Sequence, residues 1–447
     1  MQIVETNAEG LKREYTITVP YGDIEARVSG RLAEIARTVQ LPGFRPGKAP
    51  VGLLRKKYGD SIKGEVLEQT IQDTYQRTIS EKGLRPALEP KIEIVSFKDG
   101  ADLEYKMAVE VFPEIVQPDF SKLSLERLTA EAEPTRIDQV IQQIAERNRA
   151  YETASRPAET GDTVVVDFAG TVDGEPLQGG QAKGLSVQLG SKQYLPGFED
   201  QLVGAKAGEK RSIKVTLPDQ WPNEALRGKE AVFEAEVGEI KAPKPIVIDD
   251  AFAKTLGLED LAALKRAVTD QIEREYRQVA RARLKRVLLD ELAKQNDFGV
   301  PPGMVDREFE AIWQQLNQAK EAGQLDEDDK KLDEEALKKR YREIAERRVR
   351  LGLLIAEVGR QNKISVSQEE INRAMAERAR MLPGQEQRVF EFYQKNPAAM
   401  QELQAPIFED KVIDFILAVA KVSDKKVSPT ELMQDADAVA EAGGTAG

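Results

Sequence analysis

Hydrophobic and polar positions follow two different periods along the first part of the chain. Residues 11–20 alternate at every second position, which predicts a strand. From Asp23 onward, apolar residues recur every three or four positions, as in an amphipathic helix: Ile24, Val28, Leu32, Ile35 and Val39. A second helix is predicted around Val66 to Ile79, and KIEIVSF and LEYKMAVEVF predict a hairpin turned at Lys98–Ala101. We therefore expect a small α+β domain over residues 1–115.

The middle of the chain changes from a helical to a β-rich pattern. Residues 116–152 are expected to form a connector, with an amphipathic helix over 133–152. Short β-rich runs separated by Gly, Pro and Asp follow, with one short helix near Pro196–Leu202. This pattern predicts a separate β-rich domain over residues 153–243.

From residue 244 to about Val422 the apolar spacing is helical almost throughout. Pro301–Pro302 and the segment MLPGQEQ interrupt the pattern, and the last helix is predicted over Ala398–Val422. We expect an all-α domain over residues 244–430 and a disordered tail over residues 431–447, whose end is small and polar. The fold class expected for the whole chain is multidomain α+β.

Composition excludes several kinds of chemistry. The 447 residues include no His and no Cys, which rules out His-based triads, Cys nucleophiles, disulfides and the usual zinc sites. No GxxxxGK[ST] motif is present, so we expect no nucleotide cycle and no cofactor. The net charge of −12 disfavours a whole-molecule affinity for nucleic acid or anionic lipid. No secretory signal or membrane span is evident, so we expect a cytoplasmic protein without a membrane partner.

The segment GFRPGKAP, residues 43–50, places an aromatic residue and two cations among glycines and prolines. Such a stretch is usually a solvated turn between two helices. A second interpretation is a docking loop, in which Phe44 is an apolar anchor and Arg45 and Lys48 supply charge. Arg55, Lys56 and Lys57 would extend that basic patch.

The β-rich region carries several motifs that lie close together. They are a V-x-F-x-G strand at Val166–Gly170, LPGFE leading into a helix, G-x-K-x-G-E, and a closing strand with Phe233. Over about residues 157–242 this pattern resembles the FKBP-like peptidyl-prolyl isomerase domain. Rotation about an X–Pro bond needs no nucleophile, so a chain without His or Cys is compatible with this activity.

The resemblance implies an apolar pocket and assigns residues to it. Its catalytic positions are Phe168, Leu195, Phe198, Trp221 and Phe233, with Leu177 and Leu185 as substrate-binding positions. Leu177 and Leu185 stand where relatives often carry aromatics, and Gln178 stands where many carry Asp. The alternative is that these aromatic residues are ordinary core of a small barrel.

The order of domains completes the resemblance. An N-terminal α+β domain with an unbroken GFR-x-GK-x-P loop, an FKBP-like domain and a long helical region together resemble the bacterial trigger factor family. The resemblance implies that Gly43, Phe44, Arg45, Gly47 and Lys48 bind protein and RNA at the ribosomal tunnel exit. It also implies helical arms that hold unfolded chains, where Met375, Met381, Leu382 and Phe390 are candidate contacts.

We therefore expect an ATP-independent, ribosome-associated chaperone that holds nascent chains and isomerises X–Pro bonds. The expected partners are the ribosome and nascent and unfolded polypeptides, and the sequence leaves open whether the free protein forms a weak homodimer. The runner-up is a free prolyl isomerase whose flanking domains select substrates, and a third interpretation is an adaptor with an inactive barrel. The acidic cluster Asp326–Asp329 lacks the spacing of a calcium loop, so we expect a solvated tip rather than a metal site.

Overall fold

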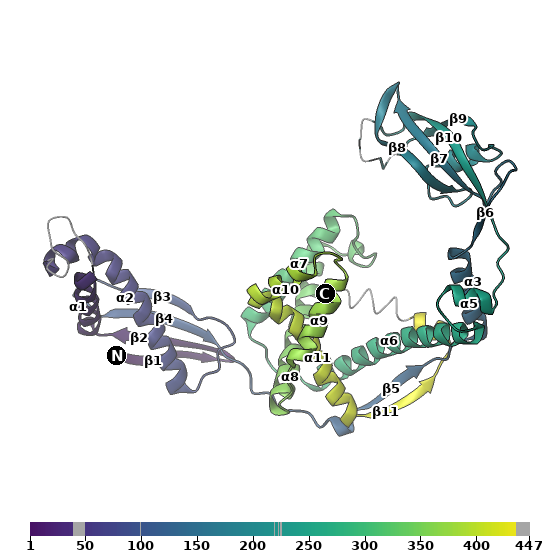
Figure 1. Cartoon of the computed structure of the whole chain (residues 1–447). Helices are drawn as coiled ribbons and strands as arrows, with labels where there is room; N and C mark the ends of the chain where they lie inside the picture. Colours follow the sequence, from purple (N-terminus) through teal and green to yellow (C-terminus); the bar gives the residue numbers. More distant parts are fainter. Residues whose placement is uncertain (39–49, 99, 219, 222, 224–225, 435–447) are drawn as a thin grey trace. The chain divides into compact units, whose positions relative to one another are not determined.

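The structure is a computed structural model that describes residues 1–38, 50–98, 100–218, 220–221, 223 and 226–434 (Figure 1). The side chains of Val51 and Gln178 also lie outside the description. The chain divides into two compact units, one of residues 1–129 and 279–447 and the other of residues 130–278. Helices and sheets occupy different segments, which confirms the expected multidomain α+β class.

The N-terminal part is a four-stranded antiparallel sheet with two helices on one face (Figure 1). Its order is β1 (Gln2–Glu9), β2 (Lys12–Val19), β4 (Leu103–Glu110) and β3 (Lys91–Ser96). Helices α1 (Tyr21–Thr38) and α2 (Val51–Lys82) cover the face on which Tyr15, Ile17, Tyr105 and Met107 are buried. The predicted strand, helices and hairpin are confirmed, although β1 was not predicted and α2 begins earlier than Val66.

A parallel strand pair joins distant parts of the chain within the first unit. Strand β5 (Ser124–Thr129) pairs with β11 (Lys421–Lys426), and Arg127 forms two hydrogen bonds with Asp424 at 2.6 and 2.9 Å. The prediction that the last helix continues to Val422 is therefore wrong at its end. Helix α11 (Pro397–Val419) stops where the backbone turns into β11. Leu432, in the first residues of the expected tail, is fully buried.

Two apolar cores lie in the described part of the helical region. One joins α6 (Leu261–Gln295), α8 (Glu334–Gln361) and α11 around Leu288, Leu354 and Ile416. The other joins α7 (Pro302–Glu321) to α8 through Val305, Ile312 and Ala345. Helices α9 (Gln368–Arg380) and α10 (Glu386–Lys395) complete the region.

Close packing between α8 and α11 requires a glycine. A β-carbon added at Gly359 would clash with Cζ of the Phe408 ring, whereas one added at Gly352 would meet nothing within 4 Å. We expect Gly359→Ala to destabilise the helical region by about 1–3 kcal/mol, because overpacking outweighs the gain in helix propensity. Gly352→Ala, on the exposed side of the same helix, is the matched control and should stabilise by about 0.5–1 kcal/mol.

Far-UV circular dichroism during thermal or urea unfolding measures both changes. Equal stability of the two variants would contradict the packing of Phe408 against Gly359.

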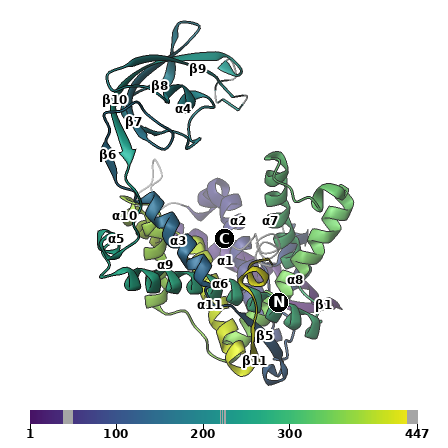
Figure 2. The same cartoon turned by 90° about the vertical axis from the view of Figure 1, so that its right-hand side faces the viewer.

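The second unit holds a five-stranded antiparallel sheet with one short helix (Figure 2). Its strands are β6 (Tyr151–Thr153), β7 (Thr163–Val172), β8 (Glu175–Gln188), β9 (Lys210–Thr216) and β10 (Glu230–Pro243). Helix α4 (Phe198–Leu202) lies between β8 and β9 in sequence, close to the predicted Pro196–Leu202. Helices α3 (Pro134–Arg147) and α5 (Asp250–Thr255) lie outside the sheet in sequence.

The two ends of this β-rich domain meet. Strand β6 pairs with the end of β10, and Lys244 N donates a hydrogen bond to the Ala150 carbonyl at 2.8 Å. Because the entry and exit of the domain are adjacent, its removal leaves a gap that a very short linker spans.

We expect that residues 151–243 can be removed and Ala150 joined to Lys244 through Gly-Ser without loss of the first unit's cooperative melting. The X–Pro isomerisation that the FKBP-like resemblance implies should be lost. Circular dichroism melting and a peptide assay measure the two outcomes. A non-cooperative transition in the remaining helices would mean that the β-rich domain is structurally integral.

Candidate functional site

Three phenylalanine rings lie at the centre of the β-rich domain. Phe168 comes from β7, Phe198 from α4 and Phe233 from β10. Each pair of rings meets edge to face, with centroids 5.5–5.6 Å apart and interplanar angles of 70–87°. This geometry is the preferred one for aromatic pairs and contributes about 0.5–1.5 kcal/mol for each pair beyond simple burial. The three elements that carry the rings are thereby fixed to one another.

The glycine of the V-x-F-x-G motif makes room for this cluster. A β-carbon added at Gly170 would lie 2.5 Å from Cε1 of Phe233. Phe233 and Gly170 are also register partners across β10 and β7. The ring therefore packs directly over the backbone of β7, where any side chain would displace it.

All seven predicted pocket residues belong to one apolar cluster. Phe198, Phe233 and Leu177 are buried, with 3%, 4% and 6% of their surfaces exposed. The other predicted residues are only partly buried: Phe168, Leu185, Leu195 and Trp221. The cluster therefore has an interior and an accessible apolar wall. None of these side chains is ionisable, so the site can act only through shape and desolvation.

Sequence reasoning missed Tyr194, which belongs to the same wall. Its ring stacks on Phe198 with centroids 6.0 Å apart and an interplanar angle of 28°. Its hydroxyl donates to the Ser186 carbonyl at 3.3 Å. Tyr194 directly precedes the LPGFE motif, and this position could have identified it as a pocket residue from the sequence.

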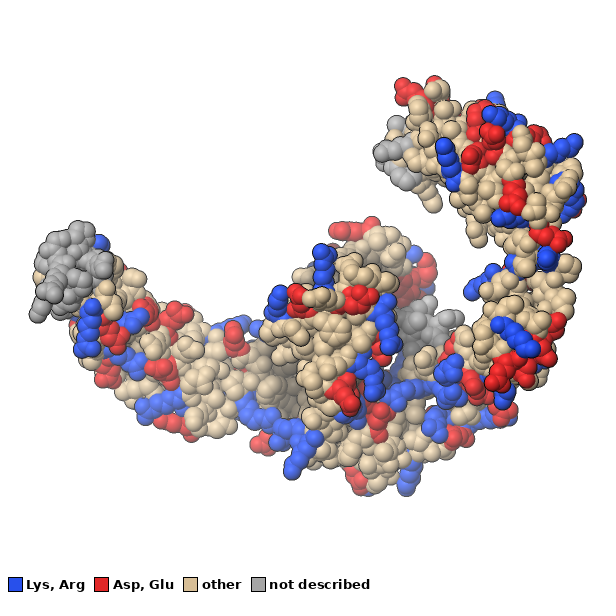
Figure 3. Space-filling model, in the orientation of Figure 1, with Lys and Arg blue, Asp and Glu red and all other residues tan. Residues whose placement is uncertain are grey.

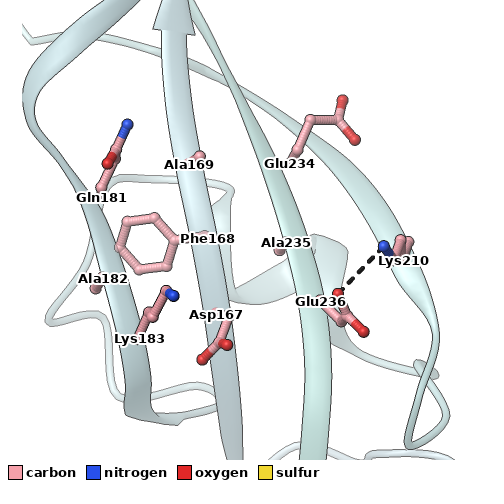
Figure 4. Close-up of a pocket in the computed structure, with 10 residues that line it drawn as sticks. All are labelled: Asp167, Phe168, Ala169, Gln181, Ala182, Lys183, Lys210, Glu234, Ala235 and Glu236. Atoms are coloured by element: carbon pink, nitrogen blue, oxygen red, sulfur yellow. Dashed lines mark ion pairs between the residues drawn. The ribbon is translucent and has the colours of Figure 1, made fainter.

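A hollow of about 550 Å³ lies mainly on the other face of the same sheet. Figure 4 shows its lining, including Asp167, Lys183, Glu234 and the Lys210–Glu236 ion pair. Along β7, Asp167 and Ala169 are exposed whereas Val166 and Gly170 are buried, because successive side chains point to opposite faces. This charged hollow shares only Phe168 with the predicted apolar pocket, so we do not assign isomerisation to it.

The predicted docking residues Gly43, Phe44, Arg45, Gly47 and Lys48 lie outside the described residues. Gln178 is described only in its backbone. The helices on either side of the loop are α1 and α2, as predicted. At the start of α2, Lys56 and Lys57 are exposed, whereas the Arg55 guanidinium is paired with Glu25.

The helical region exposes apolar side chains beside cations. A hollow of about 470 Å³ is lined by residues of α9, α10 and the turn between them: Arg378, Met381, Leu382, Arg388, Val389, Phe392 and Tyr393. Met381, Leu382 and Phe392 are 72%, 49% and 54% exposed. Phe390 is partly buried, and Met375 is buried at 4% exposure. The expectation that Met375 offers free surface is wrong, because it lies on the packed side of α9.

The acidic tip differs from the solvated tip that we expected. Asp329 is only 3% exposed and accepts hydrogen bonds from Arg340 at 3.0 Å and from the Tyr341 hydroxyl. The pKa of Tyr341 is raised to about 12, mainly because the hydroxyl is buried and secondly because it bonds to Asp329. Among the described residues, no cluster of acidic side chains has the arrangement of a metal site. Asp329 therefore fastens the tip to α8.

The described surface is heavily charged and of mixed sign. Lys and Arg lie interspersed with Asp and Glu over the face shown in Figure 3. Within the part of the chain that the structure describes, no helix is long and apolar enough to cross a bilayer.

Comparisons with known proteins match the three regions separately and the chain as a whole. Residues 1–144 match the family "Bacterial trigger factor protein (TF)", and residues 260–418 match its C-terminal family. Residues 154–238 match "FKBP-type peptidyl-prolyl cis-trans isomerase".

Two curated relatives and one solved structure extend the likeness over nearly the full length. "Trigger factor" of Paramagnetospirillum magneticum is 51% identical, covering 98% of this chain and 95% of that protein. "Trigger factor" of Rhodospirillum centenum is 48% identical, covering 97% of this chain and 98% of that protein. A solved structure concerning "Promiscuous Substrate Recognition" by "the Trigger Factor Chaperone" has the same fold, with a TM-score of 0.60 and 20% sequence identity. The match covers 94% of this chain and 99% of that chain. The chain therefore belongs to the bacterial trigger factor family of ribosome-associated chaperones and carries an FKBP-type peptidyl-prolyl isomerase domain.

Proposed function

We propose that X–Pro bonds are isomerised at the accessible wall of the phenylalanine cluster. The carrying observation is a wall of apolar and aromatic side chains (Phe168, Leu185, Leu195, Trp221 and Tyr194) that includes no carboxylate and no cation, backed by three interlocked rings. Phe198 and Phe233 form the floor, and Phe168, Leu195 and Trp221 form the wall. Leu177 and Leu185 support the wall from the side of β8.

The amide chemistry suits this arrangement. The planar X–Pro amide is stabilised by resonance, which gives rotation a barrier of about 18–20 kcal/mol. Resonance also makes the planar amide more polar than the twisted one. An apolar cradle withdraws water from the planar form and so lowers the relative free energy of the twisted form. Apolar residues that hold the proline ring are sufficient for this step.

We propose that Gly43, Phe44, Arg45, Gly47 and Lys48 dock on protein and RNA at the ribosomal tunnel exit. The two cations attract an anionic particle although the whole chain is negatively charged. Lys56 and Lys57, exposed at the start of α2, add to the same charge. Phe44 supplies the apolar anchor that charge alone lacks. This assignment places the protein in the cytoplasm.

We propose that unfolded chains are held in part at the hollow between α9 and α10. Its exposed Met381, Leu382 and Phe392 offer an adaptable apolar surface, and Arg378 and Arg388 flank it. Release then follows from weak contacts at several sites and needs no nucleotide. We propose that the same exposed apolar surfaces also allow a weak homodimer of the free protein.

Three assays on the full chain test this function against its rivals. They are co-sedimentation with ribosomes, isomerisation of an X–Pro peptide, and suppression of aggregation of an unfolded protein. We expect all three to be positive. Isomerisation without ribosome binding would favour a free isomerase with substrate-selecting domains. Ribosome binding without isomerisation would favour an adaptor whose β-rich domain is inactive.

A further inference from the structure

A buried carboxylate lies directly behind the apolar wall. Glu199 is 5% exposed and follows Phe198 in α4. One oxygen, Oε1, accepts hydrogen bonds from the Ser191 hydroxyl and the Gln193 N–H at 3.0 Å and from the Tyr194 N–H at 3.2 Å. The other, Oε2, accepts from the Lys192 N–H at 3.0 Å. One side chain thus satisfies three consecutive backbone donors and a hydroxyl.

These bonds join the wall of the site to its floor. The loop of residues 191–195 carries Tyr194 and Leu195, and α4 carries Phe198. Lys192 has a φ of 57°, in the left-handed region that non-glycine residues rarely adopt. The loop conformation therefore depends on outside contacts, and the carboxylate of Glu199 supplies four of them. The stacking of Tyr194 on Phe198 depends on the same junction.

We propose that Glu199 is a positioning residue of the isomerase, which holds Tyr194 and Leu195 at the distance from Phe198 that the twisted proline amide requires. This inference rests on the proposed role of the apolar wall. Glu199 does not touch the substrate. It acts by fixing two apolar surfaces whose separation decides how well they hold the transition state.

The electrostatics of the site agree with this role. Burial alone would raise the pKa of Glu199, but the hydrogen bonds from Lys192, Tyr194, Ser191 and Gln193 lower it below the ordinary value. The group is therefore an ionised acceptor at neutral pH. Bonds to a charged acceptor are stronger than those to a neutral one, which suits a carboxylate that must hold a strained loop.

Two substitutions of Glu199 remove different numbers of these hydrogen bonds and should lower activity to different extents. In Glu199→Gln the amide oxygen can still accept the bonds made to Oε1, but the amide nitrogen meets the Lys192 N–H as a second donor. In Glu199→Ala all four donors lose their acceptor. We expect the kcat/KM of the full chain for an X–Pro peptide to fall about 10-fold in Glu199→Gln and about 100-fold in Glu199→Ala, because small displacements of positioning groups have effects of this size.

Asp162 provides a matched control in the same domain. It is a buried carboxylate, 1% exposed, that accepts hydrogen bonds from Arg156 at 2.6 and 3.0 Å and from the Glu159 N–H at 2.8 Å. It makes none of its side-chain bonds to the loop of residues 191–195. We expect Asp162→Asn to lower the melting temperature of the domain while leaving kcat/KM unchanged below the transition.

Hydrogen exchange and steady-state kinetics separate positioning from general stability. Backbone amides of residues 191–195 should exchange faster in both Glu199 variants, while those of β7 and β10 keep their protection. A displaced wall should raise KM as well as lower kcat, whereas a smaller folded fraction lowers kcat alone. Faster exchange at 191–195 with unchanged kcat/KM would overturn the inference, and so would unchanged exchange.

A Phe198→Ala variant assayed in parallel shows whether a negative result contradicts only the positioning role of Glu199 or the proposed isomerase site as a whole. If Phe198→Ala loses activity and the Glu199 variants do not, the wall is correct and the positioning role is wrong. If Phe198→Ala also retains activity, the proposed wall itself is wrong.

Discussion

Replacing Phe198 by alanine is expected to lower kcat/KM for X–Pro isomerisation about 100-fold, while suppression of aggregation by the full chain stays unchanged. Phe198 contacts Phe168, Phe233 and Tyr194, so its loss removes the ring on which the other three depend. A 100-fold loss corresponds to about 2.7 kcal/mol of transition-state stabilisation. Client holding is unaffected because we assign it to the helical region.

The substitution also leaves a cavity, so stability needs its own control. Truncating a buried Phe to Ala costs about 3–5 kcal/mol of stability. Ile240→Ala is the matched variant, since Ile240 is 1% exposed and its strand partner Val164 lies at the far end of β7 from Phe233. It should destabilise the domain but keep isomerisation. Phe198→Leu, which keeps the apolar volume, should give an intermediate rate.

A protease-coupled peptide assay and a light-scattering assay of an aggregating client measure the two activities. Near-ultraviolet circular dichroism checks that each variant remains folded. A parallel fall of both activities in a folded Phe198→Ala protein would show that isomerisation and holding share one surface.

Local patterns predicted the elements whose partners lie nearby in sequence. The three- and four-residue spacing from Asp23 and the alternation on either side of Lys98–Ala101 correspond to α1 and to the β3–β4 hairpin. The pocket residues converged in one cluster because the motifs specify a compact arrangement of strands and a short helix. The sequence did not show which aromatic side chains are buried in the floor and which are accessible in the wall. That difference depends on neighbours in the fold, which the spacing of residues does not reveal.

Pairing between distant segments explains the main error in the predicted fold, which is that β5 and β11 were not predicted. Strand β11 has the polar sequence KVSDKK, and its partner β5 lies about 300 residues earlier, so no local alternation marks either one as a pair. The first strand, β1, is mostly exposed and therefore also lacks a clear alternation of apolar residues.

The other errors concern burial of single side chains. Met375 was expected at the surface but lies on the same buried side of α9 as Ile371 and Ala379. Asp329 was expected in solvent, but Arg340 and Tyr341 enclose it. In both cases the covering residues come from tertiary packing, which a hydropathy pattern does not encode.

Replacing Phe44, Arg45 and Lys48 together by alanine is expected to weaken ribosome binding by at least about 100-fold. Phe44 is the apolar anchor, and truncating an anchor of this kind costs 2 kcal/mol or more. Arg45 and Lys48 contribute charge, so their loss also reduces the dependence of binding on salt. Each lost contact to a phosphate should lower the slope of log K against log salt by about 1.

The α9–α10 hollow provides a control with the same chemistry. Phe392, Arg378 and Arg388 are also one aromatic residue and two cations, so the change of net charge is identical. Replacing these three by alanine should leave ribosome binding intact and weaken client holding.

Single variants divide the docking loop into its two contributions. Phe44→Ala alone should weaken binding without changing the salt slope, because it removes apolar contact only. Arg45→Ala and Lys48→Ala should each flatten the slope, because they remove charge. Co-sedimentation over a series of salt concentrations measures both quantities. If the triple variant binds as tightly as the unaltered chain at moderate salt, the loop is a solvated turn and docking lies elsewhere. If the α9–α10 control loses binding equally, loss of positive charge anywhere on the chain accounts for the effect, and the loop has no specific role.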